Sequence, residues 1–382
     1  MSASTRRLLT LGHSYVIAAN RRLAHEIAVQ GKGRWEVTAV APLHYRADLG
    51  RVAAQALPGE ASRLKTLEVR FDRMPHFMWY AGLDRVLDAP WDVVHCWEEP
   101  YVAAGAQVAR HVPPQARLVI ASFQNLSKQY PWPLSALERA SMSRADGWIA
   151  FGETVNETLR GREGYAGKPS RVIPPGLDVD RFRPDAESRR QALARIGWDC
   201  GDHVVGFLGR FVPEKGLATL LDALRGASTP WRALFVGGGP MQPALETFAR
   251  ENPGHVHIAT GVGHDDVPAW LNAMTVLCAP SEATPRWREQ FGRMLIEAMA
   301  CGIPVIASDS GEMPFVVADA GTIVRERDVS AWSEAIDRLL NDETLRREHA
   351  ARGIERAHAH YSWPLVARAH LEFFESLPDR HA

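Results

Sequence analysis

The run Glu289-Gln-Phe-Gly-Arg-Met-Leu-Ile-Glu297 continues as Ala-Met-Ala-Cys-Gly302-Ile-Pro304-Val-Ile306. Its apolar residues recur at steps of three and four, which predicts a helix that opens at Gly292 and stops at Gly302, followed by a short buried strand. Glu289 therefore precedes the helix and Glu297 lies inside it. Free N–H groups at a helix start favour an anionic ligand, and nearby carboxylates accept hydrogen bonds from hydroxyls. The run points to a ligand with both features, such as a sugar or ribose phosphate.

The composition favours an ordinary soluble protein with two domains. The chain has 382 residues, of which 46% are hydrophobic and 23% charged. Its net charge of −1 gives no electrostatic case for a nucleic-acid partner. The four scattered cysteines lack metal spacing and indicate a reducing compartment. No signal peptide or membrane-spanning run is recognised, so we expect a cytoplasmic protein.

Two series of alternating strands and helices predict an α/β protein. In the first, a strand at 7–11, a helix at 17–29 and a strand at 35–41 form a βαβ unit, which implies a parallel sheet. The proline-bounded passage 174–184 is interpreted as a linker, and a second series begins at 204. We expect two facing, doubly wound Rossmann-like domains, 1–177 completed by a helix at 363–382, and 178–362. The ligand is expected in the central cleft, at the carboxyl ends of the strands.

A second informative stretch is Gly206-Phe-Leu-Gly209-Arg210-Phe-Val-Pro213-Glu214-Lys215-Gly216. Gly209 permits close backbone approach, and Arg210 and Lys215 place two cations at the mouth of a strand. Fixed cations stabilise the charge that builds on a departing diphosphate. One such pairing at about 4 Å, with an effective dielectric near 20, contributes roughly 4 kcal/mol before desolvation. The alternative is that both are surface cations that pair with Glu214.

A glycine turn at 237–239, which includes Gly238, follows another strand. It lacks the frames of a Walker loop and of G-x-G-x-x-G, so a tight turn is the simpler interpretation. Its place at the carboxyl end of a strand still predicts that it lines the same cleft.

The order of these motifs resembles that of the family 4 retaining glycosyltransferases of GT-B fold. The resemblance rests on Gly209-Arg210, Lys215-Gly216, the glycine turn and Glu289-x7-Glu297. The passage from Pro174 to Phe182 also resembles the family's hinge, P-N-G-V-D-x-x-x-F, with Pro175 where asparagine is usual. The tail around Tyr361-Ser-Trp363 resembles the closing helix, which crosses back onto the N-terminal domain. The likeness covers nearly the whole chain and is most specific in its second half.

The resemblance implies a role for each matching position. Arg210 and Lys215 would hold the donor diphosphate and Glu289 a hydroxyl of the transferred sugar, which makes them the catalytic candidates. The implied donor-binding residues are Gly12, His13, Gly209, Gly238, Val262, Phe291, Gly292 and Glu297, the last on the ribose. The family's chemistry retains anomeric configuration and needs no divalent metal. The leaving phosphate is thought to help deprotonate the acceptor on the same face.

The first half of the chain departs from the family pattern. Its first loop has Gly12-His13-Ser14 where a Gly-Gly pair is common, and Gln124-Asn125 stand where many members carry His-Asp. These two amides and Glu98 are the acceptor-side candidates. The pair Glu98-Glu99 either receives acceptor hydroxyls or caps the start of a helix.

Three other signals have competing interpretations. Asp178-Val-Asp180 formally matches a metal-binding DxD, but its place in the hinge favours turn and cap roles, and no metal site is expected. The insert 284–288 either recognises an acidic group or forms a rigid loop. The basic and aromatic run 70–80 either touches a membrane surface or a lipid-linked acceptor, or forms a buried joint.

We expect a glycosyltransferase that moves a hexose-type sugar from a nucleotide diphosphate sugar to a hydroxyl acceptor, without metal or other cofactor. The expected partners are that donor and a glycan, lipid-linked or small-molecule acceptor, with peripheral contact at the inner face of a membrane. The alternatives are a non-catalytic or hydrolytic nucleotide-sugar-binding protein, or a sugar-nucleotide epimerase of the same fold.

Overall fold

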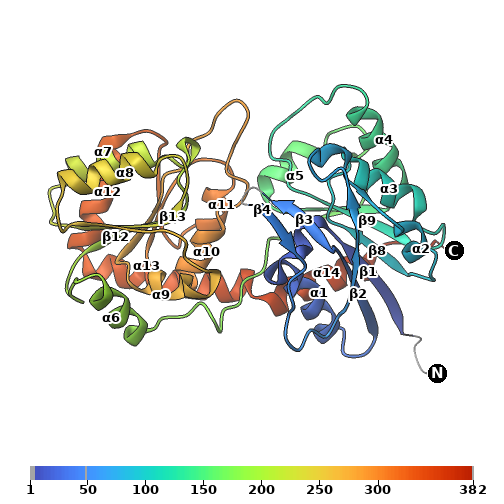
Figure 1. Ribbon diagram of the computed structural model, residues 1–382, viewed down its shortest axis with the longest axis horizontal. Helices are drawn as coiled ribbons and strands as arrows, with labels where there is room; N and C mark the ends of the chain where they lie inside the picture. Colours follow the sequence, from blue (N-terminus) through green and yellow to red (C-terminus); the bar gives the residue numbers. More distant parts are fainter. Residues whose placement is uncertain (1–4, 48–49, 381–382) are drawn as a thin grey trace. The chain divides into compact units, whose positions relative to one another are not determined.

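The computed structural model describes residues 5–47 and 50–380. The chain divides into two compact units, residues 1–176 with 363–382, and residues 177–362 (Figure 1). The first unit is therefore built from both ends of the chain, and the second from the stretch between them.

The first unit contains a parallel sheet of seven strands. The strand order is β11-β10-β9-β8-β1-β2-β5. The bounds are β1 (Arg6–Leu11), β2 (Trp35–Pro42), β5 (Arg63–Leu67), β8 (Val93–Cys96), β9 (Arg117–Ser122), β10 (Gly147–Ala150) and β11 (Ser170–Val172). The chain passes from β1 to β2 on one side and later adds β8 on the other, so the topological switch point lies between β1 and β8.

Helices cover both faces of this sheet. One face packs against α1 (Ala18–Gln30) and α14 (Trp363–Ser376). The other packs against α2 (Leu83–Leu87), α3 (Ala103–His111), α4 (Leu134–Arg144) and α5 (Glu153–Leu159). Alternate strand residues, such as Leu8 and Leu9, enter opposite cores because side chains alternate across a strand.

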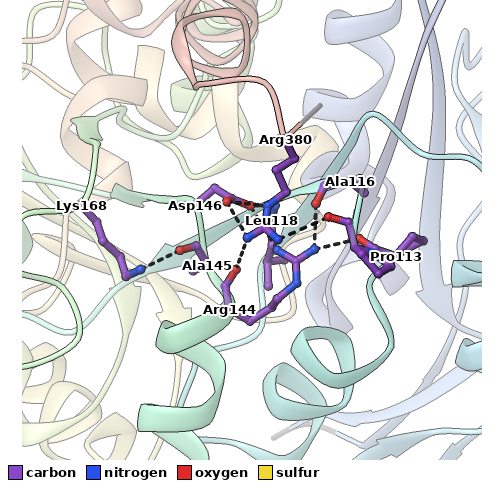
Figure 2. A network of polar contacts seen from close by, with 9 residues as sticks. Pro113, Ala116, Leu118, Arg144, Ala145, Asp146, Lys168 and Arg380 are labelled. Atoms are coloured by element: carbon purple, nitrogen blue, oxygen red, sulfur yellow. Dashed lines mark hydrogen bonds and ion pairs between the residues drawn. The ribbon is translucent and has the colours of Figure 1, made fainter. Parts of the chain in front are cut away.

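Polar contacts fix the end of the chain on the first unit (Figure 2). The guanidinium of Arg380 donates to Asp146 Oδ1 from Nε at 2.8 Å. The other carboxylate oxygen of Asp146 accepts from Leu118 N at 2.7 Å and Arg144 Nη1 at 3.2 Å. Together with the apolar face of α14, this network explains why the tail belongs to the first unit.

The second unit contains a parallel sheet of six strands in the order β14-β13-β12-β15-β16-β17. The bounds are β12 (Val204–Arg210), β13 (Arg232–Gly238), β14 (Val256–Ala259), β15 (Val276–Ala279), β16 (Val305–Ser308) and β17 (Thr322–Val324). Its switch point lies between β12, the first strand, and β15.

Both faces of the second sheet are covered as well. One face packs against α7 (Leu217–Gly226), α8 (Gln242–Glu251) and α12 (Val329–Asn341). The other packs against α6 (Ala186–Arg195), α9 (Val267–Asn272), α10 (Arg293–Ala300) and α11 (Met313–Val317). The chain then forms α13 (Glu343–Arg356) and η5 (Ala357–Tyr361) before α14.

The predicted strand–helix alternation and the two Rossmann-like parallel sheets are confirmed. The edge strand β5 and two short hairpins were not predicted from the sequence. The hairpins are β3 (His44–Ala47) with β4 (Gly50–Ala53), and β6 (Val69–Arg70) with β7 (Trp79–Tyr80). No helix in the described ranges is long and apolar enough to cross a bilayer.

Candidate functional site

The loops that leave β12 and β15 meet at the switch point of the second unit. The 3-10 helix η3 (Pro213–Lys215) ends at Gly216, which has φ 68°. A Cβ atom at Gly216 would lie 1.8 Å from the carbonyl oxygen of Pro280, the residue after β15. Only glycine permits this close approach of the two loops. The approach places Lys215 beside the segment that leads to Glu289.

Lys215 and Glu289 form an ion pair in this corner. Lys215 Nζ lies 2.5 Å from Glu289 Oε2, and Ser281 Oγ donates to the same oxygen at 3.0 Å. The side chains are 13% and 9% exposed. Lys215 Nζ also lies 5.3 Å from the ring centroid of Trp287, a cation–π contact. The insert 284–288 therefore covers the pair, and its backbone forms a turn between Thr284 and Trp287.

The helix α10 begins at Arg293, four residues after Glu289. Gly292 caps the helix with φ 81°, and a Cβ there would lie 2.9 Å from Leu295 Cδ1. Glu297 lies inside the helix and is 6% exposed. Burial raises its pKa to about 7, against the opposing charges of Arg293 and Arg181. The predicted placement of Glu289 before the helix and Glu297 within it is confirmed.

The other donor residues predicted in the second unit lie near the same edge of this sheet. Arg210 ends β12 with its side chain exposed, and it is aligned with Gly238 at the end of β13. Phe291 is 8% exposed, and its ring packs edge-to-face on Tyr361 at 5.8 Å. Val262 packs against the core beneath β14. Their roles in donor binding stay predictions.

A second ion pair lies at the switch point of the first unit. His13 opens η1 (His13–Val16) directly after β1, and Glu98 follows β8. His13 Nδ1 lies 2.8 Å from Glu98 Oε2, and His13 N donates to Oε1 at 2.5 Å. Gly12 is extended with φ −175°, so its conformation does not require glycine. A Cβ atom there would instead lie 2.8 Å from Trp97 Cβ, so packing within the unit accounts for this glycine.

The acceptor-side candidates are buried, and one of them, Glu98, belongs to this pair. Glu98, Gln124 and Asn125 are 2%, 7% and 4% exposed. Gln124 Nε2 donates to Glu99 Oε2 at 3.3 Å, and Gln124 Oε1 accepts from Tyr130 at 3.0 Å. The helix α3 begins at Ala103 with Val102 as its cap, so neither glutamate caps it. Direct contact of these residues with an acceptor stays a prediction.

Sequence reasoning did not assign roles to several residues that shape these sites. Ser281 and Trp287 hold the Lys215–Glu289 pair, and Tyr80 donates to Glu98 Oε1 at 2.6 Å. The only signal was the composition of the two aromatic segments that contain Tyr80 and Trp287. Nothing in the local sequence around Ser281 marks it, because its role depends on how two loops fold.

The hinge aspartate makes a turn contact. Asp178 Oδ1 accepts from Arg181 N at 3.2 Å, as expected for a turn residue. Across the described part of the chain, no group of three or more His, Cys, Asp or Glu side chains is arranged to hold a metal ion.

Two family models match the chain. "Glycosyltransferase Family 4" matches residues 6–181, and "Glycosyl transferases group 1" matches residues 188–358. The chain therefore belongs to the family 4 glycosyltransferases, which identifies it as a glycosyltransferase.

Individual relatives agree with this placement. The chain is 33% identical over 256 residues to a GDP-mannose-dependent alpha-(1-6)-phosphatidylinositol monomannoside mannosyltransferase of Mycolicibacterium smegmatis, a match that covers 64% of this chain and 65% of that one. It is 28% identical over 371 residues to a D-inositol 3-phosphate glycosyltransferase of Salinispora tropica, with 87% and 71% covered.

Solved structures share the fold. The Anabaena protein HepE in complex with UDP has a TM-score of 0.75 and 17% identity, with 97% of this chain and 100% of that one covered. The fold is GT-B.

Proposed function

We propose that this protein transfers a hexose from a nucleotide diphosphate sugar to a hydroxyl acceptor with retention of configuration and without a divalent metal. The second unit would bind the donor and the first unit the acceptor. The bond between the sugar C1 and the diphosphate oxygen breaks, and a new C1–O bond forms to the acceptor. The acceptor proton passes to the leaving nucleoside diphosphate.

The observation that carries this proposal is the Lys215–Glu289 pair at the switch point of the second sheet. An ammonium group there suits a diphosphate, and a carboxylate 2.5 Å away suits a sugar hydroxyl. The buried carboxyl of Glu297, further along the same helix, suits ribose hydroxyls. A phosphate that leaves beside fixed cations requires no metal ion to neutralise its charge.

The nucleotide is testable by thermal shift against UDP-, GDP-, ADP- and TDP-sugars, because a ligand that binds only the folded state raises its stability. The first candidates are GDP-mannose, which appears in the name of a relative, and UDP, which is bound in a structural neighbour. The donor that stabilises the protein is then supplied with candidate acceptors in excess chelator. We expect transfer with an unchanged anomeric configuration by NMR. Inverted product, or activity that returns only with Mn²⁺, would contradict the mechanism.

We further propose a lipid-linked acceptor and peripheral contact with a membrane through residues 70–79 of the first unit. Phe71, Met74 and Phe77 are 59%, 51% and 44% exposed, and Arg70 and Arg73 beside them are also exposed. Phe71 holds an uncommon left-handed backbone, φ 61°, that a bulky residue rarely adopts. Exposed aromatic side chains flanked by arginines suit an anionic bilayer interface.

Cosedimentation with phosphatidylcholine vesicles, with and without phosphatidylglycerol, tests this contact. We expect binding to the anionic vesicles, and loss of binding when Phe71, Met74 and Phe77 are all changed to Ser. The matched control is Phe315→Ser, since Phe315 is 44% exposed but belongs to the second unit. Wild-type protein that ignores anionic vesicles would contradict membrane contact.

A further inference from the structure

The segment that follows β15 contacts both members of the Lys215–Glu289 pair or their immediate neighbours. Ser281 Oγ donates to Glu289 Oε2 at 3.0 Å. The backbone N of the next residue, Glu282, donates to the carbonyl of Glu214 at 2.9 Å, and Glu214 precedes Lys215 in η3. Two consecutive residues therefore connect the turn that carries Lys215 with the carboxylate of Glu289.

The side chain of Glu282 ties this segment to two further elements. Oε1 accepts from Thr219 Oγ1 on α7 at 2.6 Å, and Oε2 accepts from Arg327 Nε in the loop after β17 at 2.8 Å. The Glu282 side chain is 17% exposed, and Thr219 is buried. Each carboxylate oxygen thus has its own donor, and hydrogen bonds to an ionised group are roughly twice as strong as neutral ones.

The loop after β17 also holds the following residue, Ala283. Glu326 Oε2 accepts from Ala283 N at 2.7 Å, and Arg327 Nη2 donates to the carbonyl of Ala283 at 3.2 Å. Glu326 N in turn donates at 2.8 Å to Asp309 Oδ1, directly after β16. The loops that leave β15, β16 and β17 are thereby joined to one another at the carboxyl edge of the sheet.

Arg327 has a backbone conformation that is uncommon for a residue with a side chain. Its φ is 62°, in the left-handed region that favours glycine. Strain of this kind persists where the surroundings require it, and it concentrates at functional sites. Here the left-handed turn carries the guanidinium that contacts both Glu282 and Ala283.

We propose that Glu282 and Arg327 are positioning residues that set the separation of Lys215 and Glu289 for the transfer step. This rests on the proposed function, in which Lys215 binds the diphosphate and Glu289 a sugar hydroxyl. Both groups then exchange their mutual contact for contacts with the donor, so other residues must keep them in place. A displacement of about 1 Å near a reacting group can lower the rate about 10²-fold.

Two single variants remove this support in different ways. Glu282→Ala removes both acceptor oxygens. Arg327→Gly removes the guanidinium but suits the left-handed turn, so we expect it to fold with a Tm no lower than that of wild type. In each variant we expect kcat to fall about tenfold and the donor KM to change less than about twofold, because the geometry of the pair matters in the transition state. Glu282→Gln, which keeps one acceptor oxygen, should lose less kcat than Glu282→Ala.

The matched control is Glu251→Ala. Glu251 forms an ion pair of the same kind with Arg225 in the second unit, at 2.9 Å, and both side chains are 49% exposed. No printed contact joins this pair to the segment after β15 in the described part of the chain. We expect its kcat to equal that of wild type.

A double-mutant cycle separates positioning from a general effect on the fold. Glu282→Ala is introduced into the wild type and into the double variant Lys215→Ala, Glu289→Gln, which has no pair to position. We expect the substitution to lower kcat about tenfold in the first background and less than about twofold in the second. If Glu282→Ala does not fold, Arg327→Gly takes its place in the same cycle.

Two outcomes would overturn the proposal. One is unchanged kcat in the folded Glu282→Ala and Arg327→Gly variants. The other is an equal fold-loss of kcat with and without the Lys215–Glu289 pair, since the segment would then only stabilise the fold. In either case, transfer that still depends on Lys215 and Glu289 would leave the proposed function standing. Absence of transfer by the wild type with every nucleotide sugar tested would remove the proposed function, and this role with it.

Discussion

Each unit pairs a glutamate with a cation at the switch point of its sheet, but the two pairs differ in their surroundings. In each, the cation follows the first strand of the sheet and the glutamate follows the strand on its other side: His13 with Glu98, and Lys215 with Glu289. The first pair has a fully buried acid, 2% exposed, and a cation that is 40% exposed. In the second pair both members are enclosed, at 9% and 13%.

This difference has a chemical consequence. Histidine changes its charge near neutral pH, whereas lysine ordinarily keeps its charge there. The first unit therefore carries a pair that contains a histidine, whose pKa Glu98 raises, and the second a pair that is enclosed and covered by Trp287. A doubly wound sheet determines where a ligand-binding pair can form, and the residues in the two loops determine its chemistry.

Breaking the enclosed pair should have the largest effect. We expect Lys215→Ala and Glu289→Gln each to lower kcat by about 10²- to 10³-fold, the usual loss when a preorganised charge or hydrogen bond at a reacting group is removed. The double variant should lose less than the sum, because the two residues act as a unit.

Steady-state transfer assays check this prediction, with circular dichroism to confirm folding. The matched control is Arg286→Ala, an exposed residue of the covering insert. Full activity in either folded variant would remove the pair from the site.

The next largest effect is expected on the pH dependence of stability, through Glu297 of the second unit. Burial raises the pKa of Glu297 to about 7, so the folded state keeps a proton that the unfolded chain loses near 4.5. The stability this group contributes is complete below pH 4.5 and is lost as pH rises to about 7, a change on the order of 3 kcal/mol. Glu297→Gln should remove this loss, so its Tm should rise relative to wild type between pH 5 and 7.

Two buried histidines of the first unit, His95 and His370, respond in the opposite sense. Burial lowers the pKa of His95 well below 6.5 and that of His370 to about 4, so their contribution is lost as pH falls through this range. In wild type the two trends offset each other. Calorimetry from pH 5 to 7 should therefore show that Tm rises more steeply with pH in Glu297→Gln than in wild type. Parallel Tm curves for the variant and wild type would refute the assignment.

The smallest effect is expected from the cover over Lys215. Trp287→Leu should reduce kcat/KM by about twofold to thirtyfold, since a cation–π contact contributes about 0.5–2 kcal/mol. Trp287→Phe should retain most of the activity, because it keeps an aromatic face. Equal losses in both variants would mean that the indole acts through its N–H or its size rather than through Lys215.

Much of this organisation follows from local sequence. The spacing of apolar residues from Met294 to Met299 predicts α10, and Gly302 predicts its end. Gly216 and Gly292 lie in left-handed positions, with φ values of 68° and 81°, which suit glycine. The edge strand β5 was missed because apolar and polar residues alternate only weakly along it. Its extended conformation depends on its pairing with β2.

The partners of the site residues were less predictable. From the sequence, Glu98 was expected to receive acceptor hydroxyls or to cap a helix, and His13 was expected to bind the donor. They bind each other across 85 positions, because parallel pairing of β1 with β8 brings the two strand ends together. Likewise Lys215 meets Glu289 across 74 positions, at the junction of β12 and β15.

The sequence by itself determined the family, the two Rossmann-like sheets and the residues at the strand ends, because periodicity, glycine positions and motif order are local properties. Only the tertiary structure decided which cation pairs with which glutamate and which of these groups is buried. Both depend on the strand order within each sheet, which sets distances between residues remote in the chain. Burial then fixes the charge of Glu297 and of the His13–Glu98 pair, since the cost of leaving water depends on every neighbour that the fold supplies.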